Sequence, residues 1–136
     1  MEKIEGGCLC GAVRYKSDAE PVMQAVCHCK TCQKLSGSTY SFNVAVPAES
    51  LVVTGDVATY EDHSGTSGQA MLRRFCPKCG SSLYGGGALY GPLLFIKAGS
   101  LDDASWVAPD LHIWAEEKLP WTPIPDGATV VNQNPG

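Results

Sequence analysis

The seven cysteines of this chain fall into three tight groups and are the residues best suited to chemistry. The groups are a C-x-C at Cys8 and Cys10, a C-x-C-x-x-C at Cys27, Cys29 and Cys32, and a C-P-K-C-G at Cys76 and Cys79. Four thiolates make a closed tetrahedral zinc site, whereas three leave one coordination position for water or substrate. Because seven is four plus three, the count predicts one structural metal ion and one open metal ion.

The spacing inside each group suits metal binding. Residues two apart in a strand share a face, so Cys8 and Cys10 can direct both sulfurs at one ion from an extended segment. The segment from Cys76 to Gly80 is typical of a zinc knuckle, in which backbone N–H groups point at the sulfurs and glycine allows a positive φ. An odd number of cysteines also argues against a framework made only of disulfides.

Spacing alone leaves two ways of grouping these ligands. In one, a ribbon-like closed site contains Cys29, Cys32, Cys76 and Cys79. In the other, the closed site contains Cys8, Cys10, Cys76 and Cys79, and the contiguous trio of Cys27, Cys29 and Cys32 stays open. The second grouping needs fewer long-range coincidences, because the trio is already local in sequence, but the spacing leaves both open.

Length and composition favour a single domain over 1–136. The 15 glycines and 9 prolines make the chain rich in turns, and a hydrophobic content of 44% is ordinary for a globular domain. A formal net charge of −4 without a basic run argues against nucleic acid as a partner. The N-terminal segment lacks the apolar core of a signal peptide, and no run approaches the roughly 20 apolar residues that span a bilayer. We therefore expect a cytoplasmic protein without a membrane partner, in which thiols stay reduced.

The elements that must position the cysteines are mostly strands. The clearest alternation, at 39–46, predicts a half-buried strand with Tyr40, Phe42, Val44 and Val46 on one face. Shorter strands are expected at 12–16, 22–26, 51–54, 57–61, 69–75, 82–84 and 93–98, and a helical turn only at 31–35. This pattern predicts a mainly β fold, with 120–136 as an irregular tail.

Four motifs are shared with a known family. They are G-G-C-L-C-G-A-V-R-Y at 6–15, C-H-C-K-T-C-Q-K-L-S-G at 27–37, R-F-C-P-K-C-G-S at 74–81, and H-I-W at 112–114 followed by Trp121. Over nearly its whole length the chain resembles the glutathione-dependent formaldehyde-activating enzyme (GFA) family, which includes centromere protein V type domains. The resemblance implies an Mss4-like fold of small coiled antiparallel sheets organised around zinc. It also implies the second grouping, with a structural zinc on Cys8, Cys10, Cys76 and Cys79 and a catalytic zinc on Cys27, Cys29 and Cys32.

The same resemblance implies a carbon–sulfur lyase similar to S-(hydroxymethyl)glutathione synthase. Such an enzyme forms or cleaves the S-hydroxymethyl adduct of formaldehyde with glutathione or another small thiol. An open three-thiolate zinc suits this reaction, because it can bind a substrate thiol as the thiolate and lower its pKa. The alternative is a non-catalytic zinc-binding module for protein interaction, although a scaffold has little need of an incomplete ligand set.

A proton must reach the alkoxide that develops on the aldehyde, and the chain has three histidines to supply it. His28 lies between two proposed ligands, so we expect its side chain to point away from their face. His63 lies in a polar loop and is expected to be solvated, and His112, between two apolar residues, suits a core position. None of the three is a strong candidate from the sequence alone.

Other residues are candidates for lining the pocket. The stretch 33–38 follows the trio and could offer backbone N–H groups, with the hydroxyl of Ser36 and close approach at Gly37. Trp114 and Trp121 could form a wall, although an aromatic core role fits them better. The candidates for binding a substrate carboxylate are Arg14, Lys30 and Arg73, and charged pairs of this kind more often form solvated faces.

Overall fold

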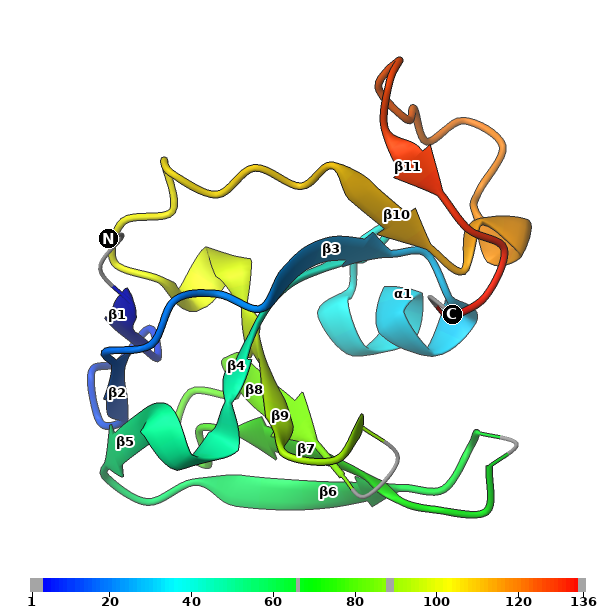
Figure 1. Ribbon diagram of the computed structural model, residues 1–136. Coiled ribbons are helices and arrows are strands. Elements are labelled where there is room, and N and C mark those ends of the chain that lie inside the picture. The colour runs from blue at the N-terminus through cyan, green and yellow to red at the C-terminus, as the bar shows by residue number, and fades with distance from the viewer. Residues whose placement is uncertain (1–3, 66, 88–89, 135–136) are drawn as a thin grey trace.

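The computed structural model describes residues 4–65, 67–87 and 90–134, which form two β-sheets, one α-helix and short 3₁₀ turns (Figure 1). The strands are β1 (Ile4–Gly7), β2 (Arg14–Ser17), β3 (Met23–Cys27), β4 (Ser41–Pro47), β5 (Leu51–Thr54), β6 (Ala58–Asp62), β7 (Met71–Phe75), β8 (Ser82–Gly86), β9 (Leu93–Lys97), β10 (Leu111–Ile113) and β11 (Thr129–Val130). The helices are α1 (Lys30–Ser36) and the 3₁₀ turns η1 (Ala48–Ser50), η3 (Ala98–Ser100) and η4 (Ala115–Glu117).

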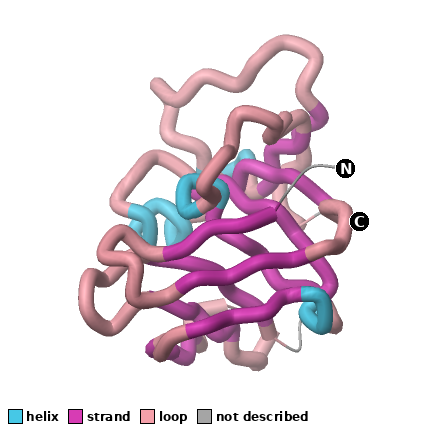
Figure 2. Tube along the Cα trace, turned by 90° about the vertical axis from the view of Figure 1, so that its left-hand side faces the viewer, coloured by secondary structure: helices cyan, strands magenta, loops and turns pink. Residues whose placement is uncertain are grey.

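The two sheets differ in size and in the direction of their strands. The smaller has the order β1-β2-β5, and the larger has the order β11-β10-β3-β4-β9-β8-β7-β6. Neighbouring strands are antiparallel, except that β10 runs parallel to both β3 and β11. Figure 2 looks onto the molecule from the side on which β1, β2 and β5 lie. The mainly β fold with antiparallel sheets predicted from the sequence is confirmed.

The main core lies between the two sheets. Ile4 and Val13 from the smaller sheet and its turn pack with Val44 and Ile96 from the larger sheet, and all four are fully buried. Burial of such side chains stabilises the fold by about 2 kcal/mol each. Gly6 in β1 permits this approach, because a Cβ there would collide with the backbone oxygen of Ser100 and with the ring of Tyr15.

The two faces of β4 lie in different surroundings. Val44 and Val46 face the core, whereas Ser41 and Asn43 face the opposite side, toward α1. The alternation expected for this strand is present, but the expectation of a half-buried strand is wrong, because Val44, Ala45 and Val46 are all 0% exposed. The strand is central in its sheet, between β3 and β9, and α1 packs against it, so both faces are covered.

Helix α1 is bounded by two distinct caps. At its start the Cys29 sulfur accepts the N–H of Cys32 at 3.2 Å, and at its end Gly37 adopts a left-handed φ of 63°. The Gly37 N–H then donates to the Gln33 carbonyl at 3.0 Å, which satisfies the last turn. The helical turn expected at 31–35 is confirmed, and Figure 1 shows it on the side toward which the larger sheet curves.

The C-terminal segment is more ordered than an irregular tail. Its residues 129–130 form β11 beside β10, and the N–H of Val131 donates to the His112 carbonyl at 2.9 Å. Further along, the N–H of Trp114 donates to the Gln133 carbonyl at 3.1 Å. The last two residues of the expected tail, 135–136, lie outside the described residues, and the single-domain organisation over 1–136 stays a prediction.

Candidate metal centres

One cysteine cluster joins the turn after β1 to the turn between β7 and β8. The sulfurs of Cys8, Cys10, Cys76 and Cys79 lie within 4.8 Å of one another, so this group could hold a metal ion. The Cys10 sulfur is 3.6 Å from that of Cys8 and 3.8 Å from that of Cys76. The extended segment expected at Cys8 and Cys10 is wrong, because the chain turns there and Gly11 has a φ of 82°.

Backbone N–H groups point at these sulfurs, as the knuckle motif predicts. The N–H of Val13 donates to the Cys8 sulfur at 3.3 Å, and the N–H of Lys78 donates to the Cys76 sulfur at 3.4 Å. A hydrogen bond with the Ser81 hydroxyl lowers the pKa of Cys79 to about 5. Donors placed in this way favour thiolates, so the four-sulfur set fits a soft cation such as zinc.

The second cluster forms where β3 meets α1. The sulfurs of Cys27, Cys29 and Cys32 also lie within 4.8 Å of one another. Cys27 and Cys32 are each only 6% exposed, whereas Cys29 is partly exposed, so the trio meets solvent on the side of Cys29. Among the described residues, no histidine, cysteine or carboxylate completes this group to four, so a tetrahedral ion held there would keep one position open.

The three thiols of the trio share charge unequally. Hydrogen bonds with Cys27 and then Cys29 lower the pKa of Cys32 far below its usual range. The same contacts act in the opposite direction on Cys27, where hydrogen bonds with Cys29 and Cys32 raise the pKa. Crowded sulfurs that hold one thiolate between them are suited to a soft cation, so the trio fits zinc as a three-coordinate protein site.

The sulfurs gather as in the second of the two groupings that the spacing allowed. Cys29 and Cys32 lie with Cys27, and Cys76 and Cys79 lie with Cys8 and Cys10. The ribbon-like alternative would need Cys76 and Cys79 beside α1, whereas they lie in the turn between β7 and β8.

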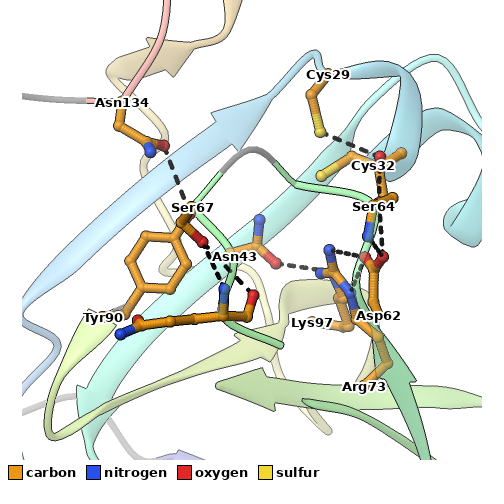
Figure 3. A network of polar contacts seen from close by, with 12 residues as sticks. Cys29, Cys32, Asn43, Asp62, Ser64, Ser67, Arg73, Tyr90, Lys97 and Asn134 are labelled. Carbon is orange, nitrogen blue, oxygen red and sulfur yellow. Dashed lines mark hydrogen bonds and ion pairs between the residues drawn. The ribbon is translucent and has the colours of Figure 1, made fainter. Parts of the chain in front are cut away.

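The face of the sheet beside the trio is polar. The Lys97 ammonium donates to the Asn43 carbonyl oxygen at 3.0 Å, and the Asn43 amide donates to the Ser41 hydroxyl at 3.0 Å. Ser41 in turn forms a hydrogen bond with Cys32 that also lowers the pKa of that thiol. Burial lowers the pKa of Lys97, and the nearby Cys32 thiolate opposes this effect. Figure 3 shows Asn43 and Lys97 in this polar network, with Cys29 and Cys32 at the start of α1.

A second cation on this face is already neutralised. Arg73 donates to an Asp62 oxygen from two nitrogens, at 2.9 and 3.2 Å, and the pair is largely buried (Figure 3). Burial opposes ionisation of Asp62, but hydrogen bonds from Ser64 and Arg73 outweigh it, so the pKa of Asp62 is lowered. Arg73 is therefore an ion-pair residue, and its availability for a substrate carboxylate is reduced.

Among the described residues, none of the three histidines belongs to either cysteine cluster. His28 is fully buried, and its Nε2 is 2.9 Å from Nδ1 of His112, with the two rings stacked at 5.1 Å between centroids. His112 pairs in register with Val26, so it lies on the opposite face of the sheet from Cys27. His63 is exposed, 3.6 Å from Glu61. The expected positions of His28, His63 and His112 are confirmed.

The stretch 33–38 forms most of α1 and its cap, so its backbone N–H groups are not free to line a pocket. The Ser36 hydroxyl donates to the Cys32 carbonyl at 2.7 Å, within the helix. The side chain of Trp121 is 69% exposed, so it forms neither part of the core nor a pocket wall. The indole N–H of Trp114 donates to the side-chain oxygen of Asn134 at 2.8 Å.

The two remaining candidates for binding a substrate carboxylate, Arg14 and Lys30, make contacts elsewhere. Arg14 forms an exposed ion pair with Asp102, on the smaller sheet and remote from the trio. The backbone N–H of Lys30 donates to the Glu117 carboxylate at 2.8 Å at the start of α1, and no contact of its ammonium within the described residues points to the trio.

Sequence reasoning missed the residues that the fold places beside the trio. Ser41 and Asn43 lie on the face of 39–46 opposite its apolar residues, so the alternation pattern contained a signal for them. Lys97 ends an otherwise apolar strand, and nothing near it in sequence indicates that β9 pairs with β4 and brings it opposite Asn43.

Comparison with known proteins agrees with this arrangement. The profile of the family described as "Glutathione-dependent formaldehyde-activating enzyme" matches residues 3–117. A Halomonas elongata protein named "Putative glutathione-dependent formaldehyde-activating enzyme" is 30% identical over 126 residues, which covers 89% of this chain and 80% of that protein.

The fold has a counterpart among solved structures. A crystal structure of a Rhodobacter sphaeroides protein aligns with a TM-score of 0.57 and 19% identity. The alignment covers 73% of this chain and 88% of that one. The two proteins therefore share a fold.

Proposed function

This chain belongs to the glutathione-dependent formaldehyde-activating enzyme family, and from that premise we propose that it forms and cleaves the carbon–sulfur bond of an S-hydroxymethyl thiol. The thiol is glutathione or a similar small thiol, and the aldehyde is formaldehyde. The reaction takes place at the trio of Cys27, Cys29 and Cys32, which makes the protein a zinc-dependent carbon–sulfur lyase.

The observation that carries this proposal is the inequality of the two cysteine clusters. Four sulfurs in one cluster satisfy a tetrahedral ion completely, which is typical of structural zinc. The trio offers only three sulfurs and is partly exposed at Cys29, which is typical of a site that admits a substrate. A protein-interaction module needs the first kind of site and has no use for the second.

The residues of each cluster have distinct roles in this proposal. Cys8, Cys10, Cys76 and Cys79 hold a structural zinc that ties the two sheets together. Zinc on the trio supplies a positive centre that lowers the pKa of an incoming thiol. Burial of Cys27 and Cys32 keeps water from two sides, and the exposed side at Cys29 admits the substrate sulfur. Holding sulfur and aldehyde together accounts for much of the rate gain.

The setting of the reaction follows from the thiols. A chain with seven free cysteines suits a reducing compartment, so we place it in the cytoplasm. Within the described residues, every helix is too short or too polar to cross a bilayer.

The test is the exchange rate between formaldehyde and its glutathione adduct. With ¹³C-formaldehyde and glutathione at equilibrium, NMR exchange spectroscopy measures how often the labelled carbon passes between the free and the thiol-bound form. We expect the zinc-loaded protein to accelerate this exchange and Cys32→Ser to abolish the acceleration, while zinc on the four-sulfur cluster and the far-ultraviolet circular dichroism are retained.

A matched control and a second thiol sharpen the result. His63→Gln changes an exposed side chain outside both clusters and should keep the wild-type exchange rate. Repeating the measurement with cysteine or 2-mercaptoethanol tells whether glutathione itself is the preferred thiol. A protein that carries two zinc ions yet accelerates no exchange with any of these thiols would refute the enzyme and favour the interaction module.

A further inference from the structure

One lysine shares a face of the sheet with the trio. In the register of the larger sheet, Cys27 of β3 pairs with Ser41 of β4, and Asn43 of β4 pairs with Lys97 of β9. Paired residues, and residues two apart in one strand, point to the same face. Cys27, Asn43 and Lys97 therefore project to one side of the sheet, and Figure 3 shows Asn43 and Lys97 there, with Cys29 and Cys32 at the start of α1.

The hydrogen bonds on this face fix the orientation of each group. An ammonium has only donors, so the Asn43 carbonyl oxygen must face Lys97, and the Asn43 amide must face the Ser41 hydroxyl. Among the described residues, Asn43 is the one hydrogen-bonding partner of the Lys97 ammonium. An ammonium carries three N–H donors, so two remain for a ligand on this face.

Of the two cations on this face, Lys97 is the one without a carboxylate partner among the described residues. The thiolates of the trio face it from β3 and α1, and Arg73 faces it from β7 but is paired with Asp62 of β6. Asn43 of β4 is neutral, and burial raises the pKa of Tyr90, so that phenol also stays neutral near pH 7. Burial lowers the pKa of Lys97, which brings its proton closer to exchange at neutral pH.

We propose that Lys97 is the catalytic acid of the carbon–sulfur step, a role that rests on the function proposed above. As the substrate sulfur adds to the aldehyde carbon, the electron pair of the C=O bond moves to oxygen, and that oxygen takes a proton from the Lys97 ammonium. The neutral amine recovers a proton from solvent. In the reverse direction the amine removes the hydroxyl proton, the C=O bond forms again and the carbon–sulfur bond breaks.

Geometry favours Lys97 over the histidines for this role. A one-carbon aldehyde places its oxygen only two bonds from the reacting sulfur, so the acid must lie on the face of the trio. His28 and His112 are hydrogen-bonded to each other, and His112 lies on the face of the sheet opposite Cys27. His63 is exposed beside Glu61. Among the lysines and histidines that the structure describes, Lys97 is the one shown on the face of the trio with N–H donors left for a ligand.

The first test compares two substitutions at Lys97 with a matched control. Lys97→Met removes the proton donor. Lys97→Arg keeps the positive charge, but a guanidinium does not release its proton near neutral pH. Each should lower the rate of adduct formation by about 100-fold or more, the usual contribution of a general acid. Lys16→Met makes the same change at an exposed position of β2 and should keep the wild-type rate.

The pH profile separates a proton donor from a structural residue. In the direction of synthesis Lys97 must be protonated, so wild-type kcat/KM should fall as pH rises through the pKa of Lys97, below the ordinary 10.5 of a lysine. Lys97→Arg should lose this fall. Asn43→Asp gives Lys97 a carboxylate partner and should move the fall upward by roughly one to three pH units.

A second readout needs no turnover. The ¹³Cε shift of Lys97, identified as the signal missing from Lys97→Arg, gives its pKa in the free protein, which should coincide with the fall in kcat/KM. A mismatch between the two, or a Lys97→Met variant with wild-type rate and pH profile, overturns the role of Lys97 and leaves the proposed function standing. A wild-type protein that accelerates no exchange refutes the function itself.

Discussion

The two cysteine clusters, loaded with zinc, should differ in how much they stabilise the fold, and two single substitutions can measure the difference. Cys10→Ser removes one sulfur from the four-sulfur cluster, and Cys29→Ser removes one from the trio. Both changes disturb little else: Cys10 is exposed, and serine is itself a preferred N-cap for α1 in place of Cys29.

The expected magnitudes follow from the lengths of chain that each cluster closes. The pair Cys10 and Cys76 spans 66 residues, whereas the trio closes only the short segment from Cys27 to Cys32. On the chain-entropy account of cross-links, the long closure stabilises the fold by about 4 kcal/mol and the short one by about 2 kcal/mol. Because small domains are stable by about 5–15 kcal/mol, Cys10→Ser should remove about a quarter or more of the free energy of unfolding.

Urea unfolding followed by far-ultraviolet circular dichroism, at a fixed zinc concentration and under a non-thiol reductant, measures both free energies of unfolding. Cys10→Ser should lower the free energy of unfolding about twice as much as Cys29→Ser. If Cys29→Ser costs as much as Cys10→Ser or more, the assignment of the four-sulfur cluster as the structural site is wrong.

Three further predictions concern the ion pair, the helix cap and metal removal. Asp62→Asn leaves Arg73 unpaired and should cost about 3 kcal/mol in urea unfolding at pH 7. Because the folded-state pKa of Asp62 is lowered, its stabilisation is complete above the unfolded value near pH 4 and is lost as pH falls through the folded value, so the difference between wild type and variant should vanish in acid. Gly37→Ala forces a side chain into a left-handed φ of 63° and should cost about 1 kcal/mol with unchanged zinc content; a neutral result would mean that the cap is dispensable. A colorimetric chelator should remove zinc in two phases of one ion each, the faster from the trio because it has fewer ligands, and a single phase would contradict the difference between the sites.

The sequence predicted the parts of this protein that local rules control. The C-x-x-C-G knuckle at Cys76 and the alternation at 39–46 depend on neighbours in sequence, and both appear in the structure. The short strands β1, β10 and β11 were missed, because Ile4–Gly7 ends in two glycines, and the three residues of β10 and two residues of β11 are too few to show a period. Pairing with β2, β3 and each other makes them strands.

The candidate site was predictable to the same extent. The cysteines can be identified as metal ligands from their residue type and spacing. The choice between the two groupings then depended only on where the fold places the three segments that hold the cysteine groups. Lys97 lies in a strand of leucines, phenylalanine and isoleucine. Its relation to Asn43 arises from the pairing of β4 with β9, which are 54 residues apart in sequence at that contact. Such a relation is a property of the sheet register, which no short window of sequence contains.

The division of β4 between two environments has an evolutionary consequence. Val44 and Val46 contribute to the packing that keeps the chain folded. On alternate positions of the same strand, Ser41 forms a hydrogen bond with Cys32 of the trio, and Asn43 forms one with Ser41. Under the function proposed above, selection on substrate preference would therefore act through one set of positions without eroding the other. Substitutions on the polar face would then change the preferred small thiol or aldehyde at little risk to folding, because the strand keeps the two demands on separate residues.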